Sequence, residues 1–142
     1  MSPLDDVSIL YTSGTTSRPK GVLATNANYI YAGETVAKAI RLTPKDRHFV
    51  VLPLFHGNAQ YYSTMSTLVT GATMAVMARF SASLYFDRCI AHECTRGKPV
   101  AAPIRMLLAQ EQRPEHRRNR LRRWFSPPRI SRRPNWMNGR NG

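Results

Sequence analysis

The sequence is poor in acidic residues, with 8 Asp and Glu against 21 Lys and Arg, which gives a formal net charge of +13 at pH 7. It is equally poor in cysteine, since Cys89 and Cys94 are the only two, and this excludes a disulfide-rich scaffold. His92 lies between them, but no second Cys or His pair follows at zinc-ligand spacing. We therefore expect no metal site and interpret both cysteines as buried thiols in a reducing cytosol.

The sequence also lacks the patterns of an exported or membrane-spanning chain. Asp5 and Asp6 stand where a signal peptide would carry basic residues. No Lys, Arg, Asp or Glu occurs from Phe49 to Ala78, but Pro53, His56 and several hydroxyl side chains interrupt the apolar run that a membrane span requires. The sequence predicts a cytoplasmic protein in which this uncharged stretch is buried.

Most of the positive charge lies at the end of the chain. Residues 113–142 hold ten Arg against the single acid Glu115. From Trp124 onward, Pro, Arg, Asn and Gly predominate and no apolar periodicity remains, so a packed element is not expected there. The sequence predicts a domain at 1–112 and a disordered or frameshifted Arg/Pro-rich tail at 113–142. The alternative is a small basic protein whose tail binds nucleic acid or acidic surfaces, although no specific nucleic-acid motif supports it.

Length and pattern favour one α/β unit. A chain of 142 residues is long enough for a single core, and short apolar runs alternate with helical patterns. This order predicts a partial doubly wound, mainly parallel sheet with flanking helices. Thr25 or Asn26 is expected to cap the first helix, Gly71 to end the second and Ser81 to cap the third. Strands are expected at 8–11, 48–52, 72–77 and 100–102, and helices at about 25–41, 59–68, 81–93 and 104–110.

One polar segment indicates anion binding. Residues 11–22 read YTSGTTSRPKGV and bring Ser and Thr hydroxyls, two Gly and Lys20 together between an expected strand and an expected helix. Hydroxyls, backbone N–H groups and a mobile cation suit a polyphosphate, whereas an ordinary surface loop is the simpler interpretation. A Walker A loop is disfavoured because Pro19 and Gly21 stand where that pattern needs Gly and a hydroxyl residue.

This segment resembles the signature loop YTSGTTGxPKGV of the acyl-adenylate-forming (AMP-binding) superfamily and departs from it at Ser17. Residues 52–58, LPLFHGN, resemble the next family motif, which delivers an aromatic residue or His beside the acyl pocket. The surrounding sequence is most similar to crotonobetaine/carnitine–CoA ligases and to medium- or long-chain fatty acid–CoA ligases.

The resemblance implies a ligase that joins a carboxylate to the α-phosphate of ATP and then transfers the acyl group to CoA, with Mg²⁺ offsetting phosphate charge. It implies His56 as the catalytic residue of the acyl and thiol channel. The residues implied to bind the nucleotide are Thr12, Ser13, Gly14, Thr15, Thr16, Lys20 and Gly21.

Other family features are missing from this sequence. No Tyr-Gly-x-Thr-Glu or Thr-Gly-Asp segment for the nucleotide is found, nor a C-terminal domain with a catalytic Lys. We therefore expect a fragment of an ATP-dependent acyl-CoA synthetase that retains the phosphate-binding loop. Its partners would be a small-molecule carboxylate and a separate remainder of the enzyme.

Overall fold

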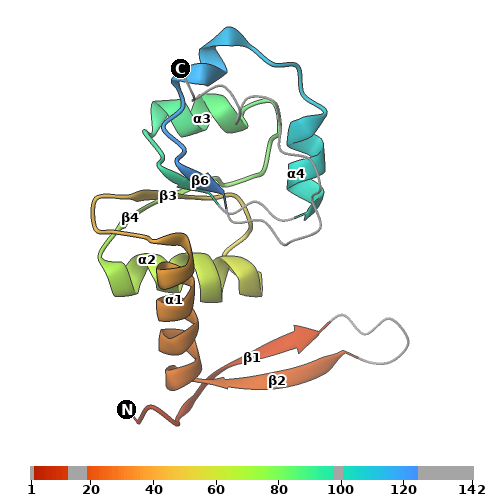
Figure 1. Cartoon of the computed structure of the whole chain (residues 1–142). Helices are drawn as coiled ribbons and strands as arrows, with labels where there is room; N and C mark the ends of the chain where they lie inside the picture. Colours follow the sequence, from red (N-terminus) through yellow and green to blue (C-terminus); the bar gives the residue numbers. More distant parts are fainter. Residues whose placement is uncertain (1, 13–18, 98–100, 125–142) are drawn as a thin grey trace.

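The computed structural model describes residues 2–12, 19–97 and 101–124. They form a two-stranded hairpin and a larger α/β layer (Figure 1). The hairpin consists of β1 (Asp6–Thr12) and β2 (Lys20–Thr25) and lies beside the start of α1 (Asn26–Ile40). The chain then enters the larger layer, which holds both hydrophobic clusters of the described residues.

The larger layer is built on a four-stranded sheet in the order β4-β3-β5-β6. Each neighbouring pair is parallel, as the alternating sequence pattern predicts. The central strand β3 (Arg47–Val50) is buried along His48, Phe49 and Val50, which is typical of a strand covered on both faces. The other strands are β4 (Thr73–Val76), β5 (Arg96–Gly97) and β6 (Arg123–Trp124).

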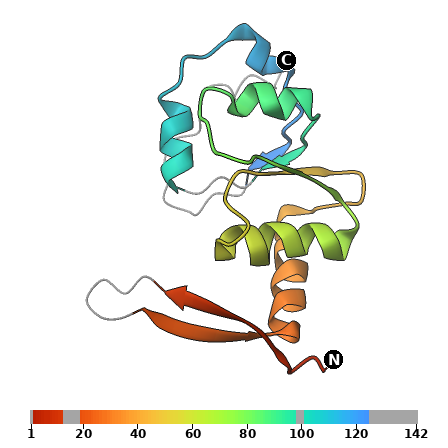
Figure 2. The same cartoon turned by 180° about the vertical axis from the view of Figure 1, so that it is seen from behind.

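Helices cover both faces of this sheet, so the predicted doubly wound arrangement is confirmed (Figures 1 and 2). One face carries α1, a π-helical segment η1 (Asn58–Thr64) and α2 (Met65–Thr70). The opposite face carries α3 (Tyr85–Ala91), α4 (Ala101–Leu108) and the 3-10 helix η2 (Pro114–Arg118). The larger hydrophobic cluster lies between the sheet and α3, and includes Phe49, Tyr85, Phe86, Cys89, Cys94, Leu107 and Leu121.

Two helix ends follow their predicted capping residues. Thr25 caps α1 by accepting a hydrogen bond from the Asn28 backbone, and the Asn28 side chain accepts one from the Thr25 backbone. Gly71 ends α2 in the left-handed conformation with φ 67°, where a residue without Cβ is favoured. The helices predicted at about 25–41 and 59–68 are therefore confirmed, although the second begins as a π-helix.

The first strand is not part of the parallel sheet, and this corrects the predicted order. β1 pairs antiparallel with β2, with Ile9 opposite Leu23 and Thr12 opposite Lys20. The sequence did not predict β2, because Pro19 and Gly21 made its beginning resemble a loop. The polar segment at 11–22 thus connects two strands rather than a strand and a helix.

Two predictions around α3 and α4 are wrong. The strand expected at 100–102 is instead β5 at Arg96–Gly97, and Ala101 and Ala102 belong to α4. Pro103 does not interrupt α4, because proline is tolerated in the first turn of a helix. The next difference concerns Ser81, which does not cap α3: that helix begins after Leu84, and the Ser81 hydroxyl lies 3.1 Å from the Ser83 hydroxyl.

Regular structure also extends beyond residue 112. Leu121 is buried in the larger hydrophobic cluster, and the backbone N–H of Arg122 donates to Thr95 at 2.9 Å. β6 then pairs with β5. The part of the chain that packs on the sheet therefore reaches Trp124, whereas the rest of the predicted tail, 125–142, lies outside the described residues.

Candidate functional site

The ends of the predicted phosphate loop are fixed by the hairpin. Thr12 is the last residue of β1 and pairs with Lys20, the first residue of β2. The structure thus brings together the backbones of two predicted nucleotide-binding residues at the open end of the hairpin. Four others, Ser13, Gly14, Thr15 and Thr16, lie outside the described residues, as does the side chain of Thr12.

Gly21 has a packing role within the hairpin. A Cβ at this position would lie 2.8 Å from Cγ2 of Ile9 and 3.6 Å from Cε1 of Tyr11. The glycine therefore allows two bulky side chains of β1 to lie over β2. The sequence suggested close backbone approach to a ligand at this position, and the structure adds a second physical reason for glycine.

The inner face of β1 packs against the segment that follows His56. The methyl carbons of Leu10 lie 3.9 Å from the position of a Cβ on Gly57. Two residues earlier, the hydroxyl of Ser8 lies 3.3 Å from the hydroxyl of Tyr61 and accepts a hydrogen bond from Tyr29 at 2.9 Å. Because side chains alternate along a strand, Ser8 and Leu10 both face this segment.

His56 lies in an exposed turn between β3 and η1. Its backbone N–H donates to Pro53 at 2.9 Å, and its Nδ1 accepts from the backbone N–H of Asn58 at 3.1 Å. An Nδ1 that accepts a hydrogen bond requires the neutral ring to carry its proton on Nε2. The described contacts therefore orient His56 and leave Nε2–H as the donor in the neutral ring.

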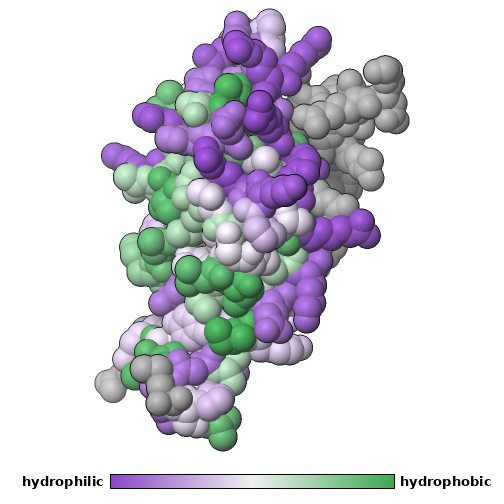
Figure 3. Space-filling model, turned by 90° about the vertical axis from the view of Figure 1, so that its left-hand side faces the viewer, coloured by the Kyte–Doolittle hydropathy of each residue, from purple (hydrophilic) through white to green (hydrophobic). Residues whose placement is uncertain are grey.

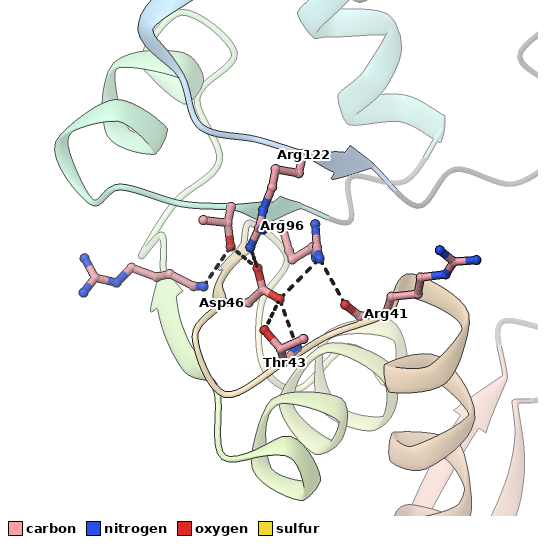
Figure 4. Close-up of polar contacts among 7 residues, drawn as sticks. Arg41, Thr43, Asp46, Arg96 and Arg122 are labelled. Atoms are coloured by element: carbon pink, nitrogen blue, oxygen red, sulfur yellow. Dashed lines mark hydrogen bonds and ion pairs between the residues drawn. The ribbon is translucent and has the colours of Figure 1, made fainter.

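Sequence reasoning missed a buried charged cluster at the end of the sheet (Figure 4). Asp46 is 1% exposed, and its carboxylate accepts hydrogen bonds from Thr43 at 2.9 Å and Thr95 at 2.6 Å. Arg96 lies 3.3 Å from the same carboxylate, and Arg122 forms a second ion pair with it. The cluster joins the turn before β3 to β5 and to the residue preceding β6.

The environment of Asp46 favours its charged form. Burial alone would raise the pKa of this carboxyl, but the hydrogen bonds from Thr95 and Thr43 and the charge of Arg96 together lower it below the ordinary value of 3.8. All the contacts come from the protein itself, so we interpret Asp46 as a structural residue. Its only sequence signal was an acid placed directly before a buried strand.

The two cysteines are fully buried members of the larger hydrophobic cluster. Burial, followed by the hydrogen bond with Cys94, raises the pKa of the Cys89 thiol well above its ordinary value. Among residues 2–12, 19–97 and 101–124, no group of three or more His, Cys, Asp or Glu side chains could hold a metal ion.

Comparison with known proteins identifies the family. A sequence model described as AMP-binding enzyme matches residues 1–130. The chain belongs to this family. Crotonobetaine/carnitine–CoA ligases of Salmonella typhi and Salmonella typhimurium are each 35% identical to it over 122 residues, which is 86% of this chain and 24% of the relative. The chain thus spans about a quarter of the length of these relatives.

Solved structures of acyl-CoA synthetases share the fold. ATP-bound MatB from Rhodopseudomonas palustris superposes with a TM-score of 0.78 at 26% identity, over 89% of this chain and 25% of that chain. The o-succinylbenzoate coenzyme A synthetase of Bacillus subtilis, in complex with ATP and magnesium ion, gives a TM-score of 0.75 at 29% identity, over 89% of this chain and 26% of that one. The predicted kinship with adenylate-forming enzymes is confirmed.

Several basic residues from 113 onward form ion pairs within the fold. Arg113 lies 2.6 Å from Asp87, and Arg120 lies 2.9 Å from Glu93. Together with the buried pair that Arg122 makes with Asp46, these contacts attach the segment to α3 and the sheet. They do not support a free nucleic-acid arm in the part of the tail that the structure describes. No helix among the described residues has the length and apolar character needed to cross a membrane.

Proposed function

We propose that this chain binds the phosphates of ATP through residues 11–22, as part of an acyl-CoA synthetase that forms an acyl-adenylate from a carboxylate and transfers the acyl group to CoA. The observation that carries the proposal is the position of the signature segment. It spans the open end of a hairpin whose β1 strand packs, through Leu10, on Gly57, the neighbour of His56.

Each part of this arrangement suits the first half of the reaction. Lys20 begins β2 and is exposed where the signature segment enters the hairpin, and it is the residue proposed to contact the β- and γ-phosphates. The hydroxyls predicted to assist it are those of Thr12, Ser13, Thr15 and Thr16. Positive charge and hydroxyl donors would stabilise the pyrophosphate as the bond to the α-phosphate breaks.

Magnesium is proposed only as a companion of ATP. We propose that the ion enters bound to the nucleotide. There it would offset phosphate charge.

His56 is proposed to shape the channel for the acyl group and the thiol. Its turn is held by hydrogen bonds to Pro53 and from Asn58, and it is adjacent to the glycine that contacts β1. The predicted cytoplasmic location agrees with a need for ATP and CoA. The full reaction would require the regions that complete the length of the relatives, supplied as a remainder of the enzyme.

Calorimetric titration of the chain with Mg²⁺-ATP tests the proposal. We expect binding that Lys20→Met weakens by about tenfold or more, because a charge-assisted contact contributes roughly 1.5–3 kcal/mol. Lys45→Met is the matched control, since Lys45 is exposed in the turn before β3, and it should bind as the wild type does. Absence of binding to the wild-type chain, or equal losses in the two variants, would refute phosphate recognition by this loop.

Turnover is tested separately by measuring pyrophosphate release with a panel of carboxylates. We expect no sustained release from this chain alone, because it spans 24% of its curated relatives. Lys20-dependent release would show instead that the part of the enzyme present here suffices for adenylation.

A further inference from the structure

Three hydroxyl groups join the hairpin to two helical elements. The Tyr29 hydroxyl donates to Ser8 at 2.9 Å, and the Tyr61 hydroxyl lies 3.3 Å from the same serine oxygen. The two tyrosine rings stack with their centroids 4.1 Å apart. Ser8, Tyr29 and Tyr61, here called the hydroxyl cluster, therefore connect β1, α1 and η1 at one point.

The hydroxyl cluster lies where β1, α1 and η1 meet, and these three elements differ in their proposed roles. Ser8 is on the strand that ends at the predicted phosphate loop, and Tyr61 is in the π-helix that follows His56. A π-helical segment is uncommon and often marks a functional site. Tyr29 is on α1, whose residues Val36, Ala37 and Ile40 are buried in a hydrophobic cluster with Leu42.

Among the described residues, a second contact joins β1 to the same segment as the hydroxyl cluster does. It is the contact of Leu10 with Gly57. Ser8 and Leu10 are two residues apart on one face of the strand, and their partners Tyr61 and Gly57 are one helical turn apart. Two contacts on the same face of β1 fix the direction of the strand as well as its distance from the segment at 57–61.

The outer face of the hairpin gives little additional support. Ile9, Tyr11 and Leu23 are 54%, 72% and 60% exposed, so among the described residues the hairpin is held mainly through its inner face. On that face the hydroxyl cluster contributes directional hydrogen bonds, whereas Leu10 contributes apolar contact without directional preference.

We propose that Ser8, Tyr29 and Tyr61 are positioning residues that set β1, the strand leading into the phosphate loop, in register with the His56 segment. This inference rests on the proposed function. Burial raises the pKa of the Tyr61 phenol, and the hydrogen bond that it shares with Ser8 opposes this shift.

The first test measures ATP affinity in variants that remove one hydroxyl at a time. Ser8→Ala and Tyr61→Phe should each weaken Mg²⁺-ATP binding by about fivefold, the equivalent of roughly 1 kcal/mol. The double variant should be no weaker than Ser8→Ala, because both changes break the same bond. Tyr31→Phe is the matched control: it removes a phenol hydroxyl from the same helix as Tyr29, its side chain is 73% exposed, and its ATP affinity should not change.

The second test needs no ATP. In the same variants, hydrogen exchange of the β1 and β2 amides should become several-fold faster, while exchange in β3 stays as in the wild type. Tyr31→Phe should change neither. Unchanged exchange in Ser8→Ala and Tyr61→Phe would overturn the positioning role. Faster exchange with unaltered ATP affinity would also overturn it, because the cluster would then only support the hairpin.

A failure of the proposed ATP binding can be distinguished from a failure of the positioning role. If the wild-type chain binds no ATP, phosphate recognition is refuted, and exchange of the hairpin amides alone decides whether the hydroxyl cluster positions β1. Losses that add fully in the double variant would contradict a shared hydrogen-bonding unit.

Discussion

The hairpin and the parallel sheet differ in what covers them. Phe49 and Val50 of β3 are 1% and 2% exposed, whereas the outer face of the hairpin leaves Tyr11 and Leu23 largely accessible. Figure 3 shows hydrophobic residues gathered on the lower half of one face, while hydrophilic residues dominate the end that carries α3 and η2. The sheet therefore holds the fold together, and the less supported hairpin carries the segment proposed to bind ATP.

The largest expected effect comes from breaking the Asp46 cluster of the sheet. Asp46→Asn removes the charge that pairs with Arg96, whose side chain is 7% exposed, and we expect a loss of about 3–5 kcal/mol in the free energy of unfolding. Urea denaturation monitored by circular dichroism measures this loss. Asp87→Asn is the control, because its pair with Arg113 is partly exposed and should contribute far less than the buried pair. Similar losses in the two variants would show that the buried ion pair stabilises the fold no more than the exposed pair does.

A smaller perturbation of the same cluster is protonation of Asp46. The folded pKa of this carboxyl lies below its ordinary value of 3.8, so the unfolded chain takes up the proton first as pH falls. The stabilisation is therefore complete above that ordinary value and is lost as pH falls through the lower folded pKa. Urea midpoints measured from neutral pH down to about pH 3 should decline more steeply in the wild type than in Asp46→Asn. Parallel curves would exclude Asp46 as a source of the acid sensitivity.

The smallest expected effect is the difference in stability between a glycine-to-alanine substitution in α1 and one in the hairpin. A Cβ on Gly33 of α1 would lie 2.8 Å from the backbone carbon and oxygen of Met65, whereas one on Gly21 of β2 would lie 2.8 Å from Cγ2 of Ile9, a side chain that is 54% exposed. Backbone cannot yield as a side chain can, so Gly33→Ala should cost about 1–3 kcal/mol and Gly21→Ala less than about 1 kcal/mol. Thermal denaturation of both variants measures the difference. An equal or larger loss in Gly21→Ala would mean that the hairpin is as tightly packed as the contact between α1 and α2.

Predictions succeeded where the residues that determine a structural feature lie close together in the sequence. Thr25 and Asn28 cap α1 through contacts three residues apart, and Gly71 ends α2 because glycine accepts a positive φ. The run HFVVL predicted a strand buried on both faces, as β3 is. The signature segment at 11–22 led to the family before any fold was known.

Predictions failed where distant partners decide the structure. β2 exists because residues 20–25 pair with β1, and no local pattern around Pro19 indicates that pairing. β5 is a strand because Arg96 and Gly97 lie between β3 and β6. The placement of Arg122 on Asp46 joins residues 76 positions apart, so charge composition suggested a tail where the fold has an ion pair.

The sequence by itself determined the α/β pattern, the start of α1, the end of α2 and the AMP-binding family, because these depend on residues close together in the chain. Tertiary structure alone decided that the signature segment closes a hairpin, that Gly57 meets Leu10, and that Ser8 joins Tyr29 to Tyr61. These contacts bring together residues from β1, α1 and η1. Their energies arise only when packing places those elements side by side.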